Sequence, residues 1–318
     1  MSIVCTGSIA YDYIMSFPGY FRDHILPESL HTISLSFLVD TMVRQRGGTA
    51  PNIAYTLALL KERPLLAATA GKDFDEYRQW LEANNIDTTY VKVIPDVYTA
   101  SFFANTDLAN AQIASFYTGA MAHACEISLR EISPAPELVV ISPNDPKAMD
   151  LYVHECLDMG IPYVYDPSQQ IVRVDANEIR AGVEGAHSLF VNEYEYELLQ
   201  KHTGLSERDI LNCVDYMVVT LGEKGAVVYT GDERYSIPAA AARQTLTPTG
   251  VGDAFRGGFL RGYRLSLDWQ TCGQMGALAA TYCLEMGGTQ CHTFTPQEFV
   301  GRYRQVFDDQ GLLAVLLK

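Results

Sequence analysis

Residues 138–165 read LVVISPNDPKAMDLYVHECLDMGIPYVY, and this stretch decides the fold class. It begins with an apolar, β-rich run at 138–142, continues with an amphipathic stretch over 147–159, and ends in a second β-rich run at 163–165. Apolar residues spaced three and four apart favour a helix, whereas short β-branched and aromatic runs favour strands. The stretch therefore predicts a strand, a helix and a second strand, the unit from which parallel sheets are built.

The same alternation extends in both directions along the chain. It predicts further strands over residues 3–5, 65–70, 189–191, 216–221 and 226–229. It predicts further helices over residues 52–60, 74–84, 176–183, 194–202, 254–263, 269–286 and 296–306. This order is typical of an α/β fold with a mostly parallel central sheet flanked by helices.

Two aromatic-rich stretches break the alternation. Residues 17–40 end in the strand-like ISLSFLV, and residues 98–117 contain the extended runs SFFANTD and QIASFYTG around a polar turn. Because neither stretch looks helical, we predict that they pair into a small β-sheet that projects from the main body. The expected division is a large α/β domain of residues 1–13, 41–96 and 120–318, and a small sheet of residues 14–40 and 97–119.

Composition limits the partners and the compartment. The 318 residues carry 23 Lys and Arg against 38 Asp and Glu, a net charge of −15 that argues against binding to nucleic acid or to a membrane surface. The seven cysteines show no metal-ligand spacing, which favours a reduced compartment. Since no signal peptide or membrane-spanning run is apparent, we expect a soluble cytoplasmic protein.

The motif TPTGVGDAFRGGFL, residues 247–260, has the strongest chemical character. Its glycines precede an apolar helix pattern, so the N–H groups of Val251, Gly252 and Asp253 can form an anion hole at a helix N-terminus. Asp253 in that place is a candidate general base that takes a proton from an attacking hydroxyl. The structural alternative is a loop with an acidic residue favoured by the helix dipole. The dinucleotide fingerprint and the P-loop motif are both absent from the chain.

Two N-terminal motifs suggest a polar binding site. In RGGTAPNIA, Gly48 allows a ligand to approach the backbone and Asn52 offers a donor and an acceptor to a diol, although a tight turn explains the pattern as well. In GSIAYD, Asp12 follows the first predicted strand, at the sheet edge where ligands bind open α/β sheets. A helix cap is the alternative for Asp12.

Two later motifs suit a nucleotide and its metal. In FVNEYEYELL, Asn192 and Glu195 lie three residues apart at a helix start and can share the water shell of Mg²⁺, with a helix cap as the alternative. In VVTLGEKGAVV, Thr220, Gly222 and Gly225 form a strand, turn and strand that a nucleotide can approach, or a plain hairpin.

The order of these motifs along the whole chain resembles the ribokinase family of carbohydrate and nucleoside kinases. Within it, GSIAYD, LPESLHTISLSFLVD, AQIASFYTGAM, DPSQQ and PTGVGDAFR are most similar to bacterial adenosine kinases and nucleoside kinases. The resemblance implies a ribokinase-like α/β fold in which the small β-sheet is a lid. It also implies Mg-ATP as phosphoryl donor and a sugar hydroxyl as acceptor, with Asp253 as the base and with Gly250, Val251 and Gly252 lining the anion hole.

The resemblance further implies where each ligand lies. Asp12, Gly48 and Asn52 would hold the ribose hydroxyls, and Asn192, Thr220, Gly222 and Gly225 would line the ATP site, with Glu195 reaching Mg²⁺ through water. The remaining residues that match nucleoside-contacting positions are Ser8, Ser36, Phe37, Phe102, Phe116, Gln169 and Gln170. The three phenylalanines offer flat apolar faces for a purine, or they fill the core of the lid.

We therefore expect transfer of the γ-phosphate of ATP to the 5′-hydroxyl of a purine nucleoside, with adenosine, giving AMP, as the first candidate. The alternatives are a sugar kinase of the ribose or fructose type and a nucleoside-binding protein without catalysis. Thr247 stands where many family members have an aspartate that helps to hold a monovalent cation, which puts K⁺ activation in doubt. The exposed edges of a β-sheet lid also suit a homodimer.

Overall fold

The computed structural model describes residues 3–25, 31, 34–231, 233–308 and 310–318. Its centre is a nine-stranded sheet with the strand order β13-β12-β11-β10-β9-β8-β1-β4-β5. The strands of this large sheet are β1 (Ile3–Thr6), β4 (Leu65–Gly71), β5 (Asp87–Ile94), β8 (Leu138–Ile141), β9 (Tyr163–Tyr165), β10 (Ser188–Asn192), β11 (Tyr216–Thr220), β12 (Ala226–Thr230) and β13 (Glu233–Ile237). Neighbouring strands are parallel except at the β11–β12 and β12–β13 pairs. The expected mostly parallel sheet is confirmed.

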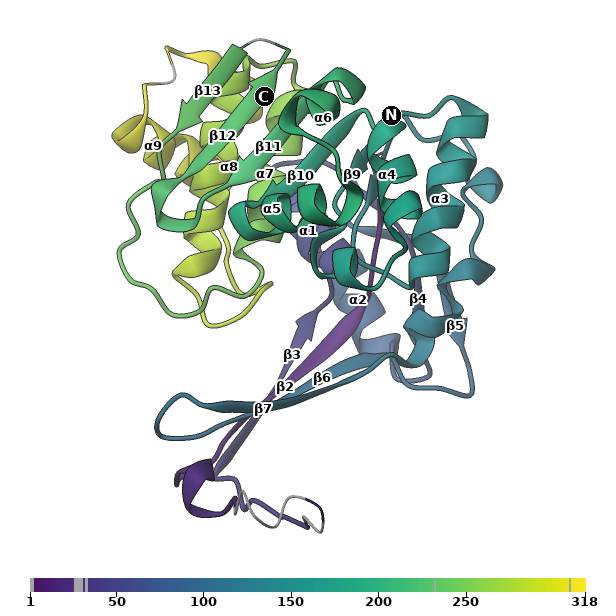
Figure 1. Ribbon diagram of the computed structural model, residues 1–318. Helices are drawn as coiled ribbons and strands as arrows, with labels where there is room; N and C mark the ends of the chain where they lie inside the picture. Colours follow the sequence, from purple (N-terminus) through teal and green to yellow (C-terminus); the bar gives the residue numbers. More distant parts are fainter. Residues whose placement is uncertain (1–2, 26–30, 32–33, 232, 309) are drawn as a thin grey trace.

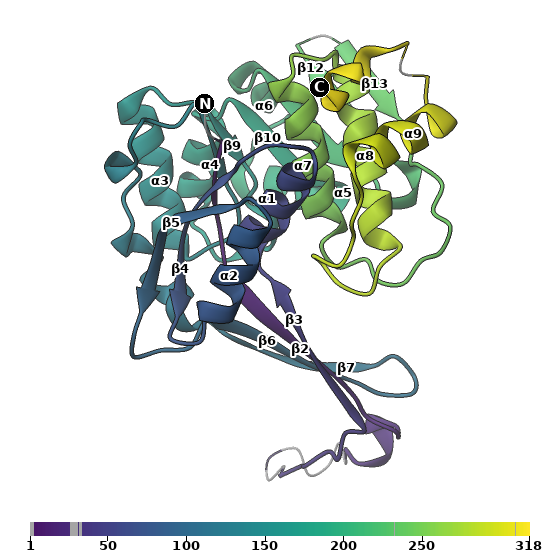
Figure 2. The same cartoon turned by 180° about the vertical axis from the view of Figure 1, so that it is seen from behind.

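Helices cover both faces of the large sheet (Figures 1 and 2). They are α1 (Thr49–Leu59), α2 (Asp75–Ala83), α3 (Pro146–Met159), α4 (Ala176–Glu184), α5 (Glu193–Thr203), α6 (Glu207–Cys213), α7 (Val251–Arg264), α8 (Trp269–Leu284) and α9 (Pro296–Val306). Within one strand the side chains alternate between two hydrophobic clusters: Val140 belongs to the cluster under α1, α7 and α8, and Val139 and Ile141 to the cluster under α3, α4 and α5. The core is thus two apolar layers separated by the sheet.

A second, four-stranded sheet projects from the body (Figure 1). Its order is β3-β2-β6-β7, with the strands β2 (Ala10–Ser16), β3 (Thr41–Gly47), β6 (Ala100–Thr106) and β7 (Gln112–Tyr117). β6 and β7 form an antiparallel hairpin from the two extended runs that the sequence predicted. β2 lies between β3 and β6, parallel to β6 and antiparallel to β3. The separate small sheet is therefore confirmed, and we call it the lid sheet.

The expected strand over residues 33–39 is wrong for the described part of that segment. Residues 34–39 form no strand, and the chain pairs with β2 only from Thr41 onward. The strand β3 itself was not predicted, because its sequence, TMVRQRG, is mostly exposed and polar and lacks the buried apolar residues that indicate a strand. Since β2 begins at Ala10 and β3 at Thr41, the lid sheet also reaches across the expected boundaries at 13/14 and 40/41.

Loops at the carboxyl ends of the parallel strands position the polar residues of interest. β1 leads to Ser8, β9 to Asp166, and β10 and β11 end at Asn192 and Thr220. Asp12 differs from expectation, because it lies within β2 of the lid sheet and not in a loop after the first strand. Within the described residues, no helix combines the length and the apolar character needed to cross a membrane.

Candidate active site

The N-terminus of α7 is open to a ligand. Its N-cap, Gly250, has a φ of 78°, and no side chain of the described residues caps the helix. A Cβ at Gly250 would lie 2.8 Å from Cγ2 of Thr289, so glycine also makes room for that loop. The Val251 N–H donates to the Pro248 carbonyl at 3.4 Å, which differs from the expected free group. The N–H groups of Gly252 and Asp253 have no acceptor among the described residues and are the ones available to an anion.

Asp253 is held by a neighbouring helix. Gly257 lets α7 approach α1 closely, since a Cβ there would lie 2.6 Å from Cβ of Thr56. At this contact Asn52 Nδ2 donates to Asp253 Oδ2 at 2.8 Å. Burial raises the pKa of the Asp253 carboxyl to about 6, while Arg256 and the Asn52 hydrogen bond act in the opposite direction. The carboxylate is thus ionised at neutral pH and fixed in direction.

A cavity of about 520 Å³, here called the large cavity, lies between the lid sheet and the body. It brings together most of the predicted substrate-binding residues, namely Ser8, Asp12, Gly48, Asn52, Phe102, Phe116, Gln169 and Gln170, together with Gly250 and Asp253. Its volume falls in the range of small-molecule sites. Arg173 also lines it, a residue that the sequence analysis did not single out.

The lid sheet supplies one wall of the large cavity. Phe102 and Phe116 lie directly opposite each other on β6 and β7, and Phe102 is also opposite Asp12 on β2. Asp12 fits there because Gly47 leaves space: a Cβ at Gly47 would lie 2.6 Å from Asp12 Oδ2. Burial, and then the charge of Asp253, raise the pKa of Asp12 to about 6. Aromatic and acidic groups thus face the same cavity from one sheet.

Ser36 and Phe37 are not brought to this cavity. Phe37 packs at the outer end of the lid sheet, with ring centroids 5.0 Å from Phe17 and 4.8 Å from Phe21, and Ser36 is exposed beside it. The ring of Phe37 therefore contacts other aromatic rings of the protein and is engaged in this cluster. Contact of Ser36 and Phe37 with a nucleoside stays a prediction, since neither residue lines the large cavity in this arrangement.

Asn52 and Gln170 are more constrained than the sequence suggested. The Oδ1 atom of Asn52 accepts from Gln290 Nε2 at 2.7 Å, so both ends of the Asn52 amide are engaged inside the protein. Gln170 is 4% exposed, and its Oε1 atom has no hydrogen-bond partner among the described residues. A buried acceptor without a partner is costly and suits a donor supplied by a ligand.

A second cavity of about 170 Å³, here called the small cavity, meets the large cavity at Gly250 and Asp253. It is lined by Ser168, Asn192, Glu195, Thr220, Gly250, Gly252, Asp253 and Arg256. Asn192 and Glu195 form the capping box of α5: Glu195 N–H donates to Asn192 Oδ1 and Asn192 N–H to Glu195 Oε2, both at 2.8 Å. The helix-cap alternative is therefore realised, yet both side chains also face the cavity.

Gly222 and Gly225 line neither cavity. They lie in the turn between β11 and β12, whose strands pair antiparallel as in the plain hairpin alternative. Gly225 has a φ of 94°, and a Cβ there would lie 2.0 Å from the carbonyl oxygen of Ile237. The described contacts thus explain this glycine by backbone packing.

Arg256 and Asp166 were missed by the sequence analysis. Arg256 NH2 donates to Asp166 Oδ1 at 2.5 Å, and the two side chains are 10% and 1% exposed. Burial raises the pKa of Asp166 to about 7 in spite of the attraction of Arg256. Arg256 lies three residues after Asp253 on α7 and therefore on the same side of the helix, a spacing that could have indicated it.

Carboxylates outnumber cations around the small cavity. In the part of the chain that the structure describes, Asp253, Glu195 and Asp166 surround the guanidinium of Arg256. Among the described residues, no three His, Cys, Asp or Glu side chains gather closely enough to hold a metal by themselves. Mg²⁺ keeps several waters and needs few protein ligands, and Glu195 keeps free lone pairs beside its two hydrogen bonds. The donor set fits a hydrated cation carried in by a polyphosphate.

Comparisons with known proteins show which family and which solved structures this chain is similar to. The model described as "pfkB family carbohydrate kinase" matches residues 3–294. The nucleoside kinase of Methanocaldococcus jannaschii is 29% identical over 94% of this chain and 96% of its own. The structure of the nucleoside kinase of Burkholderia thailandensis in complex with inosine has 37% identity, covers 96% of this chain and 98% of that one, and has a TM-score of 0.86. A structure of the same kinase in complex with ADP-inosine has 38% identity, 96% coverage of both chains and a TM-score of 0.84. Thermotoga maritima ribokinase shares the fold, with a TM-score of 0.79 at 18% identity over 96% of this chain and 99% of its own.

Proposed function

The chain belongs to the pfkB family of carbohydrate kinases, and we propose that it is a nucleoside kinase that transfers the γ-phosphate of ATP to the ribose 5′-hydroxyl of a purine nucleoside. One observation carries this proposal. The large cavity, with aromatic and polar walls, and the small cavity, at a helix N-terminus, meet at the partly buried carboxylate of Asp253. A hydroxyl entering from one side and a phosphate entering from the other would therefore meet beside a base.

The nucleoside occupies the large cavity in this proposal. The ribose lies against Asp12 and the backbone at Gly48, and the purine lies against Phe102 and Phe116 of the lid sheet. Phe116 is 43% exposed, so a base that covers it gains apolar contact. A free sugar has no flat apolar face to use that surface, which favours a nucleoside over the sugar-kinase alternative.

Adenosine is the acceptor that we propose to test first, and AMP the product. The relatives do not indicate which purine nucleoside is preferred: the structure of the Burkholderia thailandensis kinase contains inosine and not adenosine. Gln170 offers an unpartnered Oε1 atom that can accept from the exocyclic amino group of adenine, a donor that hypoxanthine lacks. This contact would favour adenosine over inosine.

The phosphates of ATP occupy the small cavity. The N–H groups of Gly252 and Asp253 and the guanidinium of Arg256 face the transferred phosphoryl group. Asn192 and Thr220 would line the approach of the nucleotide, and Glu195 would hold Mg²⁺ through water. The metal, when bound, offsets the excess of carboxylates and neutralises charge on the phosphate oxygens.

Asp253 acts as the general base. Its carboxylate accepts the proton of the 5′-hydroxyl while Asn52 holds it in place, and the helix N–H groups stabilise the charge that spreads over the phosphoryl oxygens. Because burial raises its pKa to about 6, Asp253 is ionised at neutral pH and is a better proton acceptor than an exposed aspartate.

We further propose that two copies join through the lid sheet. Its outer strands are β3 and β7, and every residue of β7 is exposed. Met42, Ile113 and Tyr117 on these strands are 62%, 43% and 43% exposed. Edge strands with exposed apolar side chains are ready to pair. A charged substitution such as Ile113→Lys should then give a monomer in light scattering, with the native circular dichroism spectrum.

The test is release of ADP with Mg-ATP and a panel of adenosine, inosine, guanosine, cytidine, ribose and fructose. The variant Asp253→Asn should lose more than about 10³-fold in kcat and still bind nucleoside. Asp96→Asn, at an exposed turn, is the matched control and should keep full turnover. Preferred turnover of a free sugar would establish the sugar-kinase alternative, and binding of adenosine without turnover would establish the binding protein.

A further inference from the structure

We propose that Gln290, supported by Tyr77, is a positioning residue that holds the Asn52 amide in the one orientation that stabilises the ionised base Asp253. The inference rests on the proposed function, because it assumes that Asp253 is the base. It concerns four elements: Tyr77 is in α2, Asn52 in α1, Asp253 in α7, and Gln290 in the loop between α8 and α9.

A chain of hydrogen bonds links these residues. The Tyr77 hydroxyl donates to the Gly47 carbonyl at 2.9 Å. Gln290 Nε2 donates to the Tyr77 hydroxyl oxygen at 2.6 Å and to Asn52 Oδ1 at 2.7 Å. Asn52 Nδ2 then donates to Asp253 Oδ2 at 2.8 Å. Tyr77, Gln290 and Asn52 are 0%, 7% and 5% exposed, so water has little access to replace any of these bonds.

The direction of the chain is determined at its two ends. The Gly47 carbonyl and the ionised Asp253 carboxylate can only accept. A chain between two acceptors needs one group in the middle that donates in both directions, and the NH2 group of Gln290 is that group. Its Oε1 atom is left buried without a partner among the described residues. Leaving an acceptor unpartnered is costly, so the arrangement favours the two donated bonds over a satisfied oxygen.

The opposite direction would change the charge state of the base. If Gln290 did not donate to Asn52, the Asn52 amide could turn and present Oδ1 to Asp253. Two acceptors would then face each other, and only a protonated Asp253 could bridge them. Gln290 therefore acts on the base through Asn52, and losing its donors should raise the pKa of Asp253.

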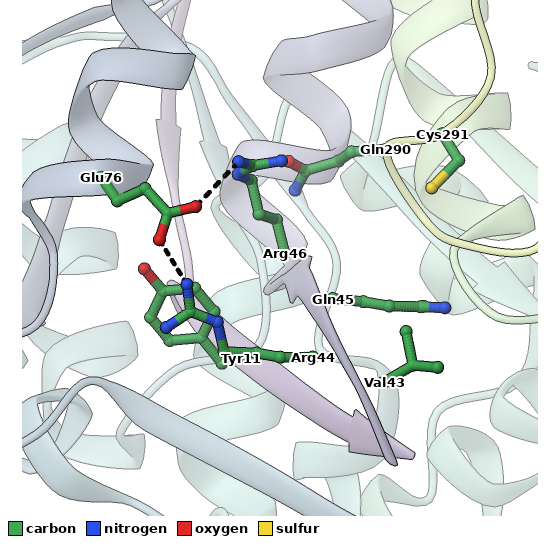
Figure 3. A pocket seen from close by; sticks show the side chains of 8 residues that line it. All are labelled: Tyr11, Val43, Arg44, Gln45, Arg46, Glu76, Gln290 and Cys291. Carbon is green, nitrogen blue, oxygen red and sulfur yellow. Dashed lines mark hydrogen bonds and ion pairs between the residues drawn. The ribbon is translucent and has the colours of Figure 1, made fainter. Parts of the chain in front are cut away.

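Neither Gln290 nor Tyr77 touches the proposed ligands. Neither lines the large or the small cavity. Gln290 lines a third cavity of about 240 Å³, and Figure 3 shows it beside Arg46. In the wall of this cavity, Arg44 and Arg46 both donate hydrogen bonds to Glu76. Gln290 thus lines this third cavity and bonds to Asn52, and its effect on the base is indirect.

The variants leave the other titratable groups near this chain of hydrogen bonds unchanged. Those that act on or are affected by Asp253 are Asp12 from β2, Glu195 from α5, Arg256 from α7, Asp166 after β9 and Cys283 from α8. Tyr11, Asp12 and Arg46 act on Tyr77, whose burial raises its pKa so far that it stays a neutral donor. A difference between variants in the chain thus reports on its hydrogen bonds.

The first readout is the pH profile of kcat/KM for the wild type, Gln290→Met and Tyr77→Phe. A bond worth about 1 kcal/mol moves a pKa by about 0.5 to 1 unit. We expect Gln290→Met to lose about three- to eightfold at pH 5.5 and less than about 1.5-fold at pH 8.5, where the base is ionised in both proteins. Tyr77→Phe should shift the acid limb in the same direction by less, and it serves alone if Gln290→Met does not fold.

The matched control is Tyr55→Phe. The Tyr55 hydroxyl donates to the His292 carbonyl at 2.8 Å, so this variant removes a buried hydrogen bond to the same loop without touching the chain. It should leave the shape of the pH profile unchanged. If all three variants lose activity equally at every pH, the loop has only a structural role and the inference is wrong.

The second readout does not depend on turnover. Carbon-13 labelling of aspartate side chains, with Asp253→Asn to assign the signal, gives the titration midpoint of Asp253 directly. The midpoint should be higher in Gln290→Met than in the wild type. An unchanged midpoint would overturn the inference, whereas a shifted midpoint in a protein without kinase activity would sustain it and refute the proposed function.

Discussion

Replacing Arg256 with methionine tests how the small cavity balances its charges. The substitution keeps an unbranched, shorter side chain and removes the guanidinium that pairs with Asp166. Asp166 is left as a buried carboxylate whose remaining side-chain donor among the described residues is Ser142 Oγ, at 3.1 Å. The structure thus predicts a loss of stability that depends on the charge of Asp166.

The magnitude follows from the geometry of the pair. At an N–O distance of 2.5 Å, with an effective dielectric constant of about 20, the attraction amounts to about 7 kcal/mol. The variant avoids the desolvation cost of burying a guanidinium, and this saving offsets part of the lost attraction. The net loss of folding free energy is therefore about 3–5 kcal/mol at pH 8. The pKa of Asp166 is raised to about 7, above the unfolded value of 3.8, so its ionised form opposes folding as the pH rises through 7. Below that pKa the carboxyl is protonated in both proteins, so the loss at pH 5.5 should be smaller than at pH 8 by about 1.4 kcal/mol, the linkage energy of one pH unit above a pKa of about 7.

The assay is urea unfolding followed by tryptophan fluorescence at pH 8 and pH 5.5. It compares the wild type, Arg256→Met, Asp166→Asn and the double variant Asp166→Asn/Arg256→Met. The double variant no longer has the charge of Asp166 to compensate and should lie closer to the wild type than Arg256→Met does, although Asp253 and Glu195 still lack the guanidinium. Its kinase activity should nevertheless be about 10²- to 10³-fold lower, because the transferred phosphate has lost the positive charge that faces it.

Two results would refute this reasoning. Equal destabilisation of the single and double variants at both pH values would mean that packing, and not charge, accounts for Arg256. A double variant with wild-type turnover would remove Arg256 from the phosphate site.

Three further predictions concern catalysis and binding. The kcat/KM of the wild type should fall about tenfold per pH unit below about 6, since Asp253 must be ionised; a flat profile down to pH 5 would contradict its role as base. Phe102→Leu should raise the KM for the nucleoside about three- to tenfold through lost stacking, whereas Phe37→Leu should change it less than about twofold because that ring packs on Phe17; equal effects would bring Phe37 into the site. Exchange of Na⁺ for K⁺ should change kcat by less than about twofold, since Thr247 replaces the expected aspartate; a tenfold activation would show that the backbone suffices for a cation site.

The elements that the sequence predicted well are those with a strong periodic pattern. α3 and α9 lie within a residue of their expected bounds, because each has an apolar face and begins with a recognisable N-cap residue followed by proline, Asp145 for α3 and Thr295 for α9. β2 and β3 were not predicted as a pair, since both are only partly buried and their pairing is decided by contacts between distant backbone segments. β5, β13 and α6 were missed for a similar reason, because they are short or largely exposed.

The predictability of the site follows the same division. Asp253, Gly250 and Gly48 could be named because each sits in a local motif whose chemistry depends on neighbouring residues. Asp166 and Gln290 could not, because their partners are far away in the sequence. Asp166 is 90 positions from Arg256, and Gln290 is 238 from Asn52. Such pairs exist only once the helices have packed, and a single sequence carries no signal for them.

The motif GDAFRGGF combines two physical requirements that a sequence cannot separate. Gly252 lines the small cavity, where we propose that the phosphates of ATP bind. Gly257 and Gly258 serve packing, since Cβ atoms there would lie 2.6 Å from Cβ of Thr56 on α1 and 2.6 Å from the Met275 carbonyl oxygen on α8. The close approach to α1 is what brings Asn52 within hydrogen-bond distance of Asp253. The later glycines therefore contribute to the chemistry by setting the distance between two helices, and the base owes its orientation to packing one turn farther along α7.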